Sequence, residues 1–242
     1  MLIPQRPIWG GWVVGPTFIA PEEFARAGYD YVGFDLQHSY LDDADVAVLL
    51  RRLEDVPIAT AVRLASTDPA PIGRVLDAGA DALIVAMVES PEQATAAVAA
   101  TRYPPAGLRS FGPLRASLGL DPAALESRVS VFAMVETARG LSALDEIAAV
   151  AGLSGLYVGP ADLAISMGHS PADAWSHPDV CEAIQRVVAA ASARGLGSGI
   201  HAGTGARGKL AADWGFRMIT LASESQALCR GAAAHLREAT HE

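Results

Sequence analysis

The sequence predicts an α/β fold, a single (β/α)8 TIM barrel, and three observations support that prediction. The chain has 242 residues, close to the roughly 250 that such barrels use in one domain. Short β-rich runs alternate with segments of helical spacing, as in a parallel sheet with crossover helices. Eight such runs occur, the number at which a barrel closes. Because no linker or composition shift divides the chain, we expect one domain over residues 1–242.

The eight expected strands are short hydrophobic runs spaced along the whole chain. They cover residues 8–14, 31–35, 58–63, 82–85, 131–135, 155–158, 197–200 and 218–221. Helices are expected between them, because apolar residues recur there at the i, i+3, i+4 and i+7 positions that form one face of a helix. One such stripe consists of Val46, Leu49, Leu50 and Leu53, and another of Val180, Ile184, Val187, Val188 and Ala191.

Helix boundaries are marked by residues with typical capping roles. Asp42, Ser90 and Asp121 precede expected helices, and their side chains can accept hydrogen bonds from the free N–H groups of a first turn. Proline follows Ser90 and Asp121, where it suits the first helical position. Glycines that stand between a helix and the next strand, as C-terminal caps do, are Gly28, Gly79, Gly152 and Gly195.

Residues 101–120 do not fit this alternation. The segment contains three prolines, three arginines and three glycines, so we expect a long ordered loop rather than a helix. Long loops in compact domains usually have a function. We therefore expect this loop to serve as an active-site lid or as a subunit contact.

Composition and charge argue against several classes of function. The net charge is −9, whereas nucleic-acid binding needs a basic face and membrane-surface binding needs a polybasic patch. The longest purely apolar run, residues 82–88, is too short to span a bilayer. No signal pattern begins the chain, and Cys181 and Cys229 have no metal or redox spacing. We expect a cytoplasmic protein that binds neither nucleic acid nor membranes.

Barrel enzymes hold their catalytic residues at the carboxyl ends of the strands, so those positions define the candidate site. Polar or aromatic side chains at these ends are Trp12, Asp35, Gln37, His38, Arg63, Glu136, Asp162, His201, Ser223 and Glu224. A barrel with only a structural role has no reason to concentrate polar residues at one end. We therefore expect a catalytic site there.

Glu136 and Asp162 are the candidate metal ligands. Each follows a hydrophobic strand, so both carboxylates are expected on the rim of the barrel, facing inward. Two carboxylates held together repel each other unless a proton or a cation separates them. Oxygen ligands with open positions suit Mg²⁺ or Mn²⁺. The alternative is that each carboxylate caps the next helix or pairs with an arginine.

Asp35 and His38 form a candidate general base, because an acid beside a histidine fixes its tautomer and raises its basicity. Arg63 ends the third expected strand, where its guanidinium could bind a substrate carboxylate or stabilise an enolate oxygen. The alternatives are a structural histidine, and a salt bridge from Arg63 to Asp35 or Glu136.

Lys209 is the only lysine in the chain, and it falls after the seventh expected strand rather than inside the barrel. An aldolase that forms a Schiff base needs a buried lysine amine, so the sequence argues against that mechanism and favours a metal as electron sink. Residues 203–209 (GTGARGK) have P-loop spacing, but Leu210 stands where a P-loop requires Ser or Thr. A simpler phosphate-binding loop remains an alternative.

Several segments resemble the HpcH/HpaI aldolases, a family of metal-dependent (class II) pyruvate aldolases related to citrate lyase β-subunits. The resemblance extends over nearly the whole chain. Its most specific segments are FDLQH at residues 34–38, RVLDAGA at 74–80, ATRYPP at 100–105, VET at 135–137 and VGPADL at 158–163. They occur in the order expected for the family.

The resemblance implies a role for each candidate catalytic residue. Glu136 and Asp162 match the two protein ligands of a divalent metal, commonly Mg²⁺, Mn²⁺ or Co²⁺. His38, supported by Asp35, resembles the family's base, which acts directly or through a metal-bound water. Arg63 resembles the arginine that contacts the pyruvate-derived part of the substrate and stabilises the enolate.

The resemblance also implies a substrate pocket and an assembly. Trp12 matches an aromatic residue of the pocket, and backbone groups around Gly159, Pro160 and Ala161 would receive the pyruvate carboxylate. Members of the family are typically homo-oligomers, trimers or hexamers built from trimers. Their last helix is swapped between neighbouring barrels, so we expect the same here.

The chain departs from the family pattern at several positions, which points to an altered acceptor pocket. Gln37 stands where a glutamate is usual, Met134 where a glutamine is common, and His201 where an aliphatic residue is usual. The segment at residues 117–129 is shorter than the corresponding segment in typical members of the family. The segment at 222–224 reads ASE in place of a common GSD.

We therefore expect a metal-dependent lyase that reversibly cleaves a 4-hydroxy-2-oxo acid to pyruvate, or a pyruvate analogue, and an aldehyde. One alternative is a related enolate lyase that acts on a CoA thioester or decarboxylates an oxaloacetate-like acid. For the phosphates of CoA, Arg102, Arg109 and Arg115 are the only evident candidates. The other alternative is a non-catalytic barrel that binds a small acid or serves as an assembly partner.

Overall fold

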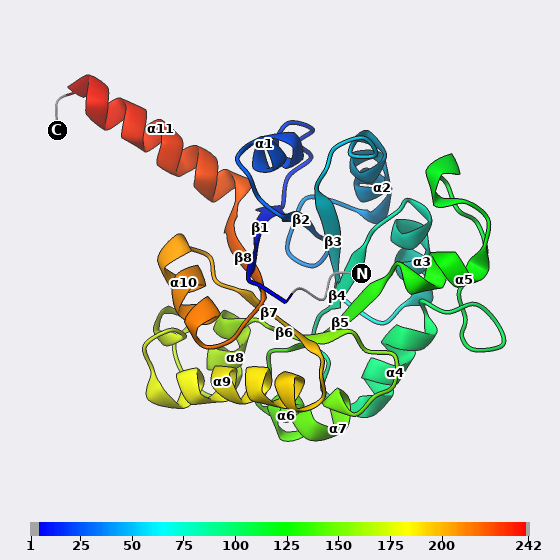
Figure 1. The fold of residues 1–242 in the computed structure, drawn as a ribbon. Coiled ribbons are helices and arrows are strands. Elements are labelled where there is room, and N and C mark those ends of the chain that lie inside the picture. Colours follow the sequence, from blue (N-terminus) through cyan, green and yellow to red (C-terminus); the bar gives the residue numbers. More distant parts are fainter. Residues whose placement is uncertain (1–4, 241–242) are drawn as a thin grey trace.

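A closed barrel of eight parallel strands forms the centre of the molecule, described by a computed structural model for residues 5–240. Strands pair in chain order, and β8 closes the barrel against β1 (Figure 1). The strands are β1 (Ile8–Val13), β2 (Tyr31–Asp35), β3 (Ala59–Leu64), β4 (Ala82–Val85), β5 (Ser130–Val135), β6 (Gly155–Val158), β7 (Gly197–His201) and β8 (Met218–Ser223). The predicted fold class is confirmed, and each predicted strand is present with its ends shifted by two residues or fewer.

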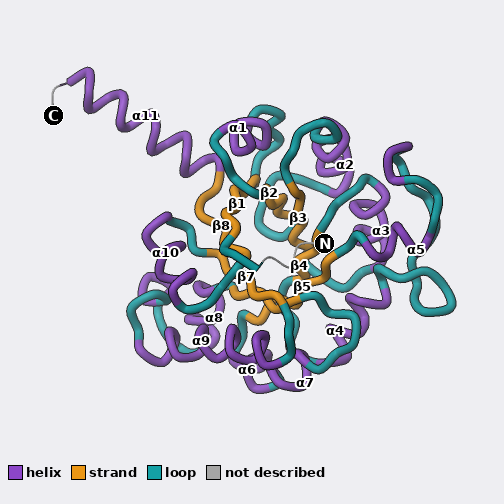
Figure 2. Tube along the Cα trace, viewed as in Figure 1, coloured by secondary structure: helices purple, strands orange, loops and turns teal. Residues whose placement is uncertain are grey.

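Helices surround the barrel, and all but α11 pack around its outside (Figure 2). They are α1 (Ala20–Arg26), α2 (Asp43–Arg52), α3 (Pro69–Asp77), α4 (Pro91–Ala99), α5 (Pro122–Ser127), α6 (Ala138–Ser142), α7 (Leu144–Ala148), α8 (Pro160–Ser166), α9 (Pro178–Ala193), α10 (Gly205–Asp213) and α11 (Glu224–Thr240). The predicted caps are confirmed, because Asp42, Ser90 and Asp121 accept hydrogen bonds from the first turns of α2, α4 and α5.

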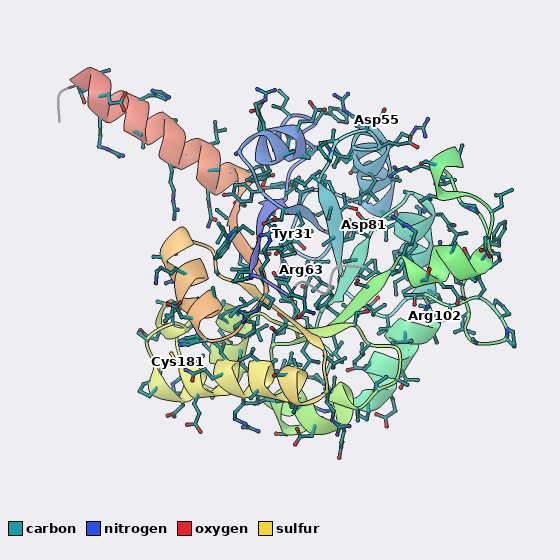
Figure 3. The ribbon with its side chains drawn as sticks, viewed as in Figure 1. Tyr31, Asp55, Arg63, Asp81, Arg102 and Cys181 are labelled. Atoms are coloured by element: carbon teal, nitrogen blue, oxygen red, sulfur yellow. The ribbon has the colours of Figure 1, made fainter. Side chains whose placement is uncertain are left out.

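The barrel interior is packed rather than open. Tyr31 on β2 and Tyr157 on β6 are fully buried there, and both hydroxyl groups hydrogen-bond to the Thr220 hydroxyl, at 2.8 and 2.6 Å. Gly10 on β1 leaves room for this packing, because a Cβ at Gly10 would lie 2.0 Å from the Tyr31 ring. Tyr31 pairs with Ala59 at the amino end of β2 and β3, whereas Arg63 pairs with Asp35 at their carboxyl end; Figure 3 labels both near the centre of the barrel. The interior core therefore supports the side chains at the carboxyl rim from below.

The loop at residues 101–120 lies at the opposite end of the barrel from the carboxyl rim. Arg109 forms an ion pair with Asp77, the last residue of α3, at 2.8 Å, and the Leu114 N–H donates to the Asp77 carbonyl. The ends of α2 and α3 lead into the amino ends of the following strands. The expectation of a lid over this barrel's own site is therefore wrong, because the loop is bound to the other face. A subunit contact stays a prediction.

The last helix, α11, extends away from the barrel (Figure 1). None of its described residues is buried, and Leu228 and Leu236 are 74% and 66% exposed. Trp9 on β1 and Leu221 on β8 pack against the core but are only partly buried. In a usual barrel the helix that follows β8 packs over β8 and β1, but here α11 does not cover this part of the barrel. Within residues 5–240, no helix combines the length and apolarity needed to cross a membrane.

Candidate active site

A cavity of about 270 Å³ opens at the carboxyl rim of the barrel. Six of its lining residues belong to the predicted rim: Arg63, Gly159, Pro160, Ala161, Asp162 and His201. Trp12 lies next to it, with the Arg63 guanidinium 5.5 Å from its ring centroid and the His201 ring 5.4 Å away, edge-on. Residues far apart in the sequence therefore meet where barrel enzymes place their sites.

Glu136 is buried at this rim, with 1% of its surface exposed. Its Oε1 accepts a hydrogen bond from the Met87 N–H at 2.8 Å, whereas Oε2 has no hydrogen-bond partner within residues 5–240. Burial, aided by the negative charge of Asp162, raises the pKa of Glu136 to about 7, although the hydrogen bond from Met87 opposes the shift. A buried carboxylate oxygen with no partner, next to a second carboxylate, is a site that a cation would stabilise.

The backbone around Glu136 is arranged to leave Oε2 free. A Cβ on Gly159, the residue that begins the turn into α8, would lie 2.4 Å from this oxygen. Met87, which holds Oε1, has a φ of 56°, a left-handed conformation that is uncommon for residues other than glycine. Asp162 stands in the first turn of α8, where the helix dipole favours an anion. The residues present therefore fit a divalent metal with oxygen ligands.

Asp35 pairs with Arg63 rather than with the His38 ring, which corrects the predicted base pair. Arg63 Nε and Nη2 donate to the two oxygens of Asp35 at 2.9 and 2.5 Å, and Trp12 Nε1 donates at 3.3 Å. The other contacts of Asp35 are with the backbone N–H groups of Gln37 and His38. The carboxylate points into the barrel, toward the charge of Arg63, and leaves no oxygen for an imidazole three residues away.

The His38 side chain is exposed and makes no hydrogen bond within the described residues. Asp35 positions it only indirectly, by holding the backbone of the turn that carries it. Arg63 keeps access to the cavity despite its ion pair, because its Nη1 makes no hydrogen bond in the described chain. The predicted alternative for Arg63, a salt bridge to Asp35, is therefore present together with its predicted place at the site.

His201 ends β7 and contributes an imidazole ring to the cavity wall. Burial and, to a smaller extent, the positive charge of Arg63 together lower the pKa of His201 to about 4. The ring is therefore neutral near pH 7 and can donate one hydrogen bond and accept another.

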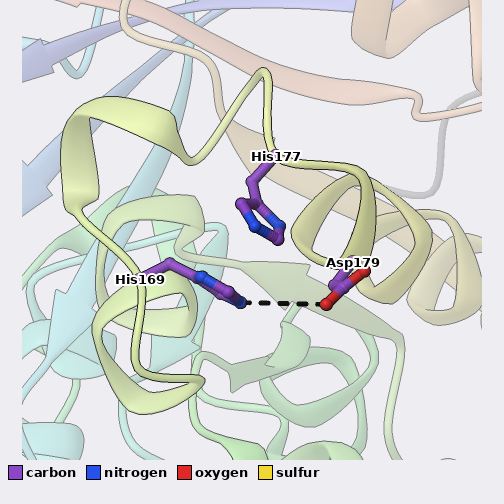
Figure 4. A group of neighbouring side chains, drawn as sticks. All are labelled: His169, His177 and Asp179. Carbon is purple, nitrogen blue, oxygen red and sulfur yellow. Dashed lines mark ion pairs between the residues drawn. The ribbon is translucent and has the colours of Figure 1, made fainter.

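A second group of possible metal ligands, His169, His177 and Asp179, lies between α8 and α9 (Figure 4). The two imidazole rings stack with their centroids 3.7 Å apart and their planes inclined by 29°. A metal lies in the plane of each imidazole that binds it, at about 2 Å from the nitrogen. Rings stacked this closely do not meet that condition at one point, so the group is better explained as packing that holds this loop.

The three arginines considered for CoA binding lie away from the cavity. Arg102, Arg109 and Arg115 belong to the loop at the amino end of the barrel and lie against carboxylates, at 3.8, 2.8 and 3.6 Å. They are therefore already neutralised and are on the wrong face for a substrate at the rim.

A protein-family model described as HpcH/HpaI aldolase/citrate lyase matches residues 10–230, nearly the whole chain. The chain belongs to this family. Membership makes it an enzyme of the lyase class, and lyases of this family act on small molecules and generally depend on a divalent metal ion. The resemblance stated from the sequence is thus confirmed.

Named relatives of this HpcH/HpaI chain include two kinds of aldolase. A hydroxypyruvate/pyruvate aldolase of Rhizorhabdus wittichii is 38% identical over 223 residues, which cover 90% of this chain and 88% of the relative. A 5-keto-4-deoxy-D-glucarate aldolase of Salmonella arizonae is 34% identical, with 92% and 88% covered. A crystal structure of an HpcH/HpaI family protein from Burkholderia cenocepacia J2315 has a TM-score of 0.90 and 35% identity, covering 97% and 95% of the two chains.

Sequence reasoning missed Trp175 and Gln226 on the cavity wall, and it included Arg207 only as part of the glycine-rich segment 203–209. Trp175 lies between α8 and α9, and Gln226 lies in α11, where the sequence has no strand-end signal. For Arg207 a signal exists, because it stands in the glycine-rich segment that follows the seventh strand at the carboxyl rim. The Met87 N–H that holds Glu136 could not be predicted, because a backbone donor leaves no mark in a sequence.

Proposed function

We propose that this HpcH/HpaI chain is a metal-dependent pyruvate aldolase. It reversibly cleaves a 4-hydroxy-2-oxo acid to pyruvate, or a pyruvate analogue, and an aldehyde. The observation that carries the proposal is the buried Oε2 of Glu136, which lacks a protein partner and lies near Asp162. The aldolase names of relatives at 34–38% identity support the same activity.

We propose Mg²⁺, Mn²⁺ or Co²⁺ as the metal, held by Glu136 and Asp162. When bound, a divalent ion supplies Lewis-acid polarisation of the 2-oxo acid. Backbone N–H groups around Gly159, Pro160 and Ala161, of which Pro160 itself has none, would receive the substrate carboxylate at the N-terminus of α8, where free N–H groups favour an anion. Hard oxygen ligands and a small cavity support this choice of ion.

The proposed proton path uses His38 and Arg63. In cleavage, His38 takes the proton of the C4 hydroxyl, directly or through a water molecule, and the C3–C4 bond breaks to release the aldehyde. The electron pair of that bond forms the pyruvate enolate, which gains a proton at C3 to become pyruvate. Arg63 faces the enolate oxygen with its free Nη1 and stabilises the negative charge, while Asp35 fixes the orientation of its guanidinium.

The test is a screen of 4-hydroxy-2-oxo acids for pyruvate release, coupled to a dehydrogenase, with and without added metal. We expect release that EDTA abolishes and Mg²⁺, Mn²⁺ or Co²⁺ restores. Glu136→Ala should lose metal binding and aldehyde release together, whereas Glu146→Ala, an exposed carboxylate on α7, should lose neither. Full activity in protein stripped of metal would reject the proposal, and activity only with CoA thioesters or oxaloacetate would favour the related enolate lyases.

We also propose a homo-oligomer, a trimer or hexamer, in which α11 is swapped between barrels. A groove of about 600 Å³ between α1 and the start of α11 supports this, because its lining is mostly apolar and includes Ile19, Phe24 and Leu228. The exposed face of α11 carries Leu228 and Leu236, which fit such a groove on a second copy. The free thiols Cys181 and Cys229 support the cytoplasmic location that we propose.

A further inference from the structure

Two histidines close the neck of the segment between α8 and α9. His169 follows α8, His177 directly precedes α9, and their rings stack with centroids 3.7 Å apart (Figure 4). The segment between them contains the short 3-10 helix η2 (Pro171–Asp173) and contributes Ala174 and Trp175 to the wall of the cavity at the carboxyl rim. The stack therefore fixes the base of a loop that forms one side of the cavity.

Backbone hydrogen bonds hold each side of this neck but do not connect the two sides. On one side the His169 N–H donates to a carbonyl of α8 at 2.9 Å, and on the other the His177 N–H donates to the Asp173 carbonyl at 2.8 Å. In the described chain, no backbone hydrogen bond joins residues 167–169 to residues 170–177. The stacked side chains therefore fasten two sides that the backbone leaves unconnected.

The two rings differ in how they can accept a proton. Asp179, in the first turn of α9, lies 4.0 Å from His169 Nε2 and provides a counter-charge for a proton on that ring. His177 Nδ1 is buried and has no hydrogen-bond partner within residues 5–240. A protonated imidazole donates from both nitrogens, so a charged His177 would hold a buried N–H group without an acceptor. One proton on His169 is therefore compatible with the stack, whereas a second proton on His177 is not.

No other charge near the stack compensates for a second proton among the residues that the structure describes. The charged or titratable side chains on the surrounding elements are Asp162 on α8, Asp173 in η2, Asp179, Cys181 and Glu182 at the start of α9, and Arg207 on α10. Of these, Asp179 alone pairs with one of the two rings. Two imidazolium rings at 3.7 Å also repel each other, because a like charge this close disfavours the second ionisation. A doubly charged pair therefore separates.

We propose that the stack of His169 and His177 is a pH-sensitive latch on the cavity wall. The latch is closed while at most one ring is charged and opens when both are charged, which loosens the part of the wall that carries Ala174 and Trp175. The open segment binds one proton more than the closed segment, so acid favours opening by up to about tenfold for each pH unit. Histidine side chains ordinarily change charge between about pH 5 and 8, and the second proton is the harder to add. Opening is therefore expected in the acid part of this range.

The test compares amide hydrogen exchange over residues 167–177 in the wild type and in His169→Phe, at pH 7.5 and at pH 5.5, by mass spectrometry of peptic peptides. Phenylalanine keeps a ring for the stack but cannot be charged, and comparison of two proteins at one pH cancels the intrinsic effect of pH on exchange. We expect equal exchange at pH 7.5 and exchange up to about tenfold faster in the wild type at pH 5.5.

A second variant and a control make this comparison specific. His177→Phe should behave like His169→Phe, because the doubly charged pair needs both rings, and the His177 side chain caps no N–H group of α9. The matched control is His235→Gln on α11, since His235 has an acidic neighbour, Glu238 at 3.8 Å, but no stacked ring in the described chain. This control should exchange like the wild type. Equal exchange in the wild type and both phenylalanine variants at pH 5.5, or the same difference at both pH values, would overturn the latch.

The effect on the cavity is measured separately, as the affinity for pyruvate with Mn²⁺ by isothermal titration, and this measurement rests on the proposed function. Between pH 7.5 and pH 5.5 the wild type should lose about twofold or more affinity relative to His169→Phe, because affinity falls with the fraction of closed protein. Changes that both proteins share, such as protonation of Glu136, cancel in this ratio. Equal losses despite faster exchange would overturn the link between latch and cavity. Failure of the proposed function appears instead as no pyruvate binding at either pH, and the exchange experiment then still decides whether the latch exists.

Discussion

The Asp35 carboxylate connects three elements at the rim. It accepts hydrogen bonds from Trp12 on β1, from Arg63 on β3 and from the turn after β2. Burial alone would raise the pKa of Asp35, but the hydrogen bonds and the charge of Arg63, with the N–H groups of Gln37 and His38, hold it below the usual 3.8. The ionised pair of Asp35 and Arg63 therefore stabilises the structure of the site, and Asp35 also fixes the position of the Arg63 guanidinium.

Asp35→Asn should lower the free energy of unfolding by about 3 kcal/mol, because it leaves the buried guanidinium of Arg63 without a counter-charge. Urea denaturation at pH 7 measures this. Asp213→Asn, which removes the exposed partner of Lys209, should change it by less than about 1 kcal/mol. Equal effects of the two substitutions would contradict the account.

Since the pKa of Asp35 is lowered on folding, the stabilisation that its carboxylate provides is complete above pH 3.8 and lost as pH falls below that value.

His201 should make stability depend on pH in the weakly acidic range. Its pKa falls from 6.5 to about 4 on folding, so between these values the unfolded chain binds a proton that the folded chain does not. Its stabilisation is complete above pH 6.5 and lost as pH falls toward 4. Between pH 7 and pH 5 the wild type should lose about 1–2 kcal/mol more than His201→Gln, measured by urea denaturation. Parallel losses in both proteins would show that the ring is not buried as described.

At the residue scale, the sequence predicted positions better than partners. Glu136, Asp162 and Arg63 could be placed on the rim because each follows a hydrophobic strand, and strand ends of a barrel meet at one face. The partner of Asp35 could not be predicted, because His38 is near in sequence whereas Arg63 is near in space. Short separation along the chain favoured the wrong pair.

At the scale of elements, the turn from β6 into α8 controls the metal ligands. Gly159→Ala should weaken divalent-metal binding by at least about tenfold, because its Cβ would lie 2.4 Å from Glu136 Oε2 and 2.6 Å from Met134. The φ of −100° at Gly159 suits alanine, so folding should be preserved. Isothermal titration with Mn²⁺ measures the affinity, and circular dichroism checks the fold. Gly205→Ala, where a Cβ has open space, is the control, and equal metal affinity in both variants would contradict this role.

Strands were easier to predict than short helices for a physical reason. A buried parallel strand is a hydrophobic run that shows within four to six residues, as in β4 and β6. The five-residue helices α6 and α7 are too short to display a helical period, and their positions are set by packing instead. The loop at residues 101–120 was predicted as a loop from its prolines, but the face it covers depends on Asp77 in α3.

At the scale of the molecule, the count of eight strands predicted closure of the barrel, whereas the position of α11 followed only from the resemblance to the family. A swapped α11 should make the assembly depend on its apolar residues. Leu228→Glu with Leu236→Glu should dissociate the oligomer, because both side chains would be buried against a second copy. Light scattering coupled to size exclusion measures the mass. Val48→Glu, an exposed apolar residue on α2, should leave it unchanged, and an unaltered mass in the double variant would contradict the swap.

The central claim is that Glu136 and Asp162 bind a divalent metal that promotes enolate formation from pyruvate. Exchange of the pyruvate methyl protons with D₂O, followed by proton NMR, tests this without any choice of aldehyde. The account predicts exchange by the wild type with Mg²⁺, none after EDTA treatment, and none by Glu136→Gln, which keeps the shape of the side chain but removes its charge. Exchange that survives EDTA, or that persists undiminished in Glu136→Gln, would contradict it.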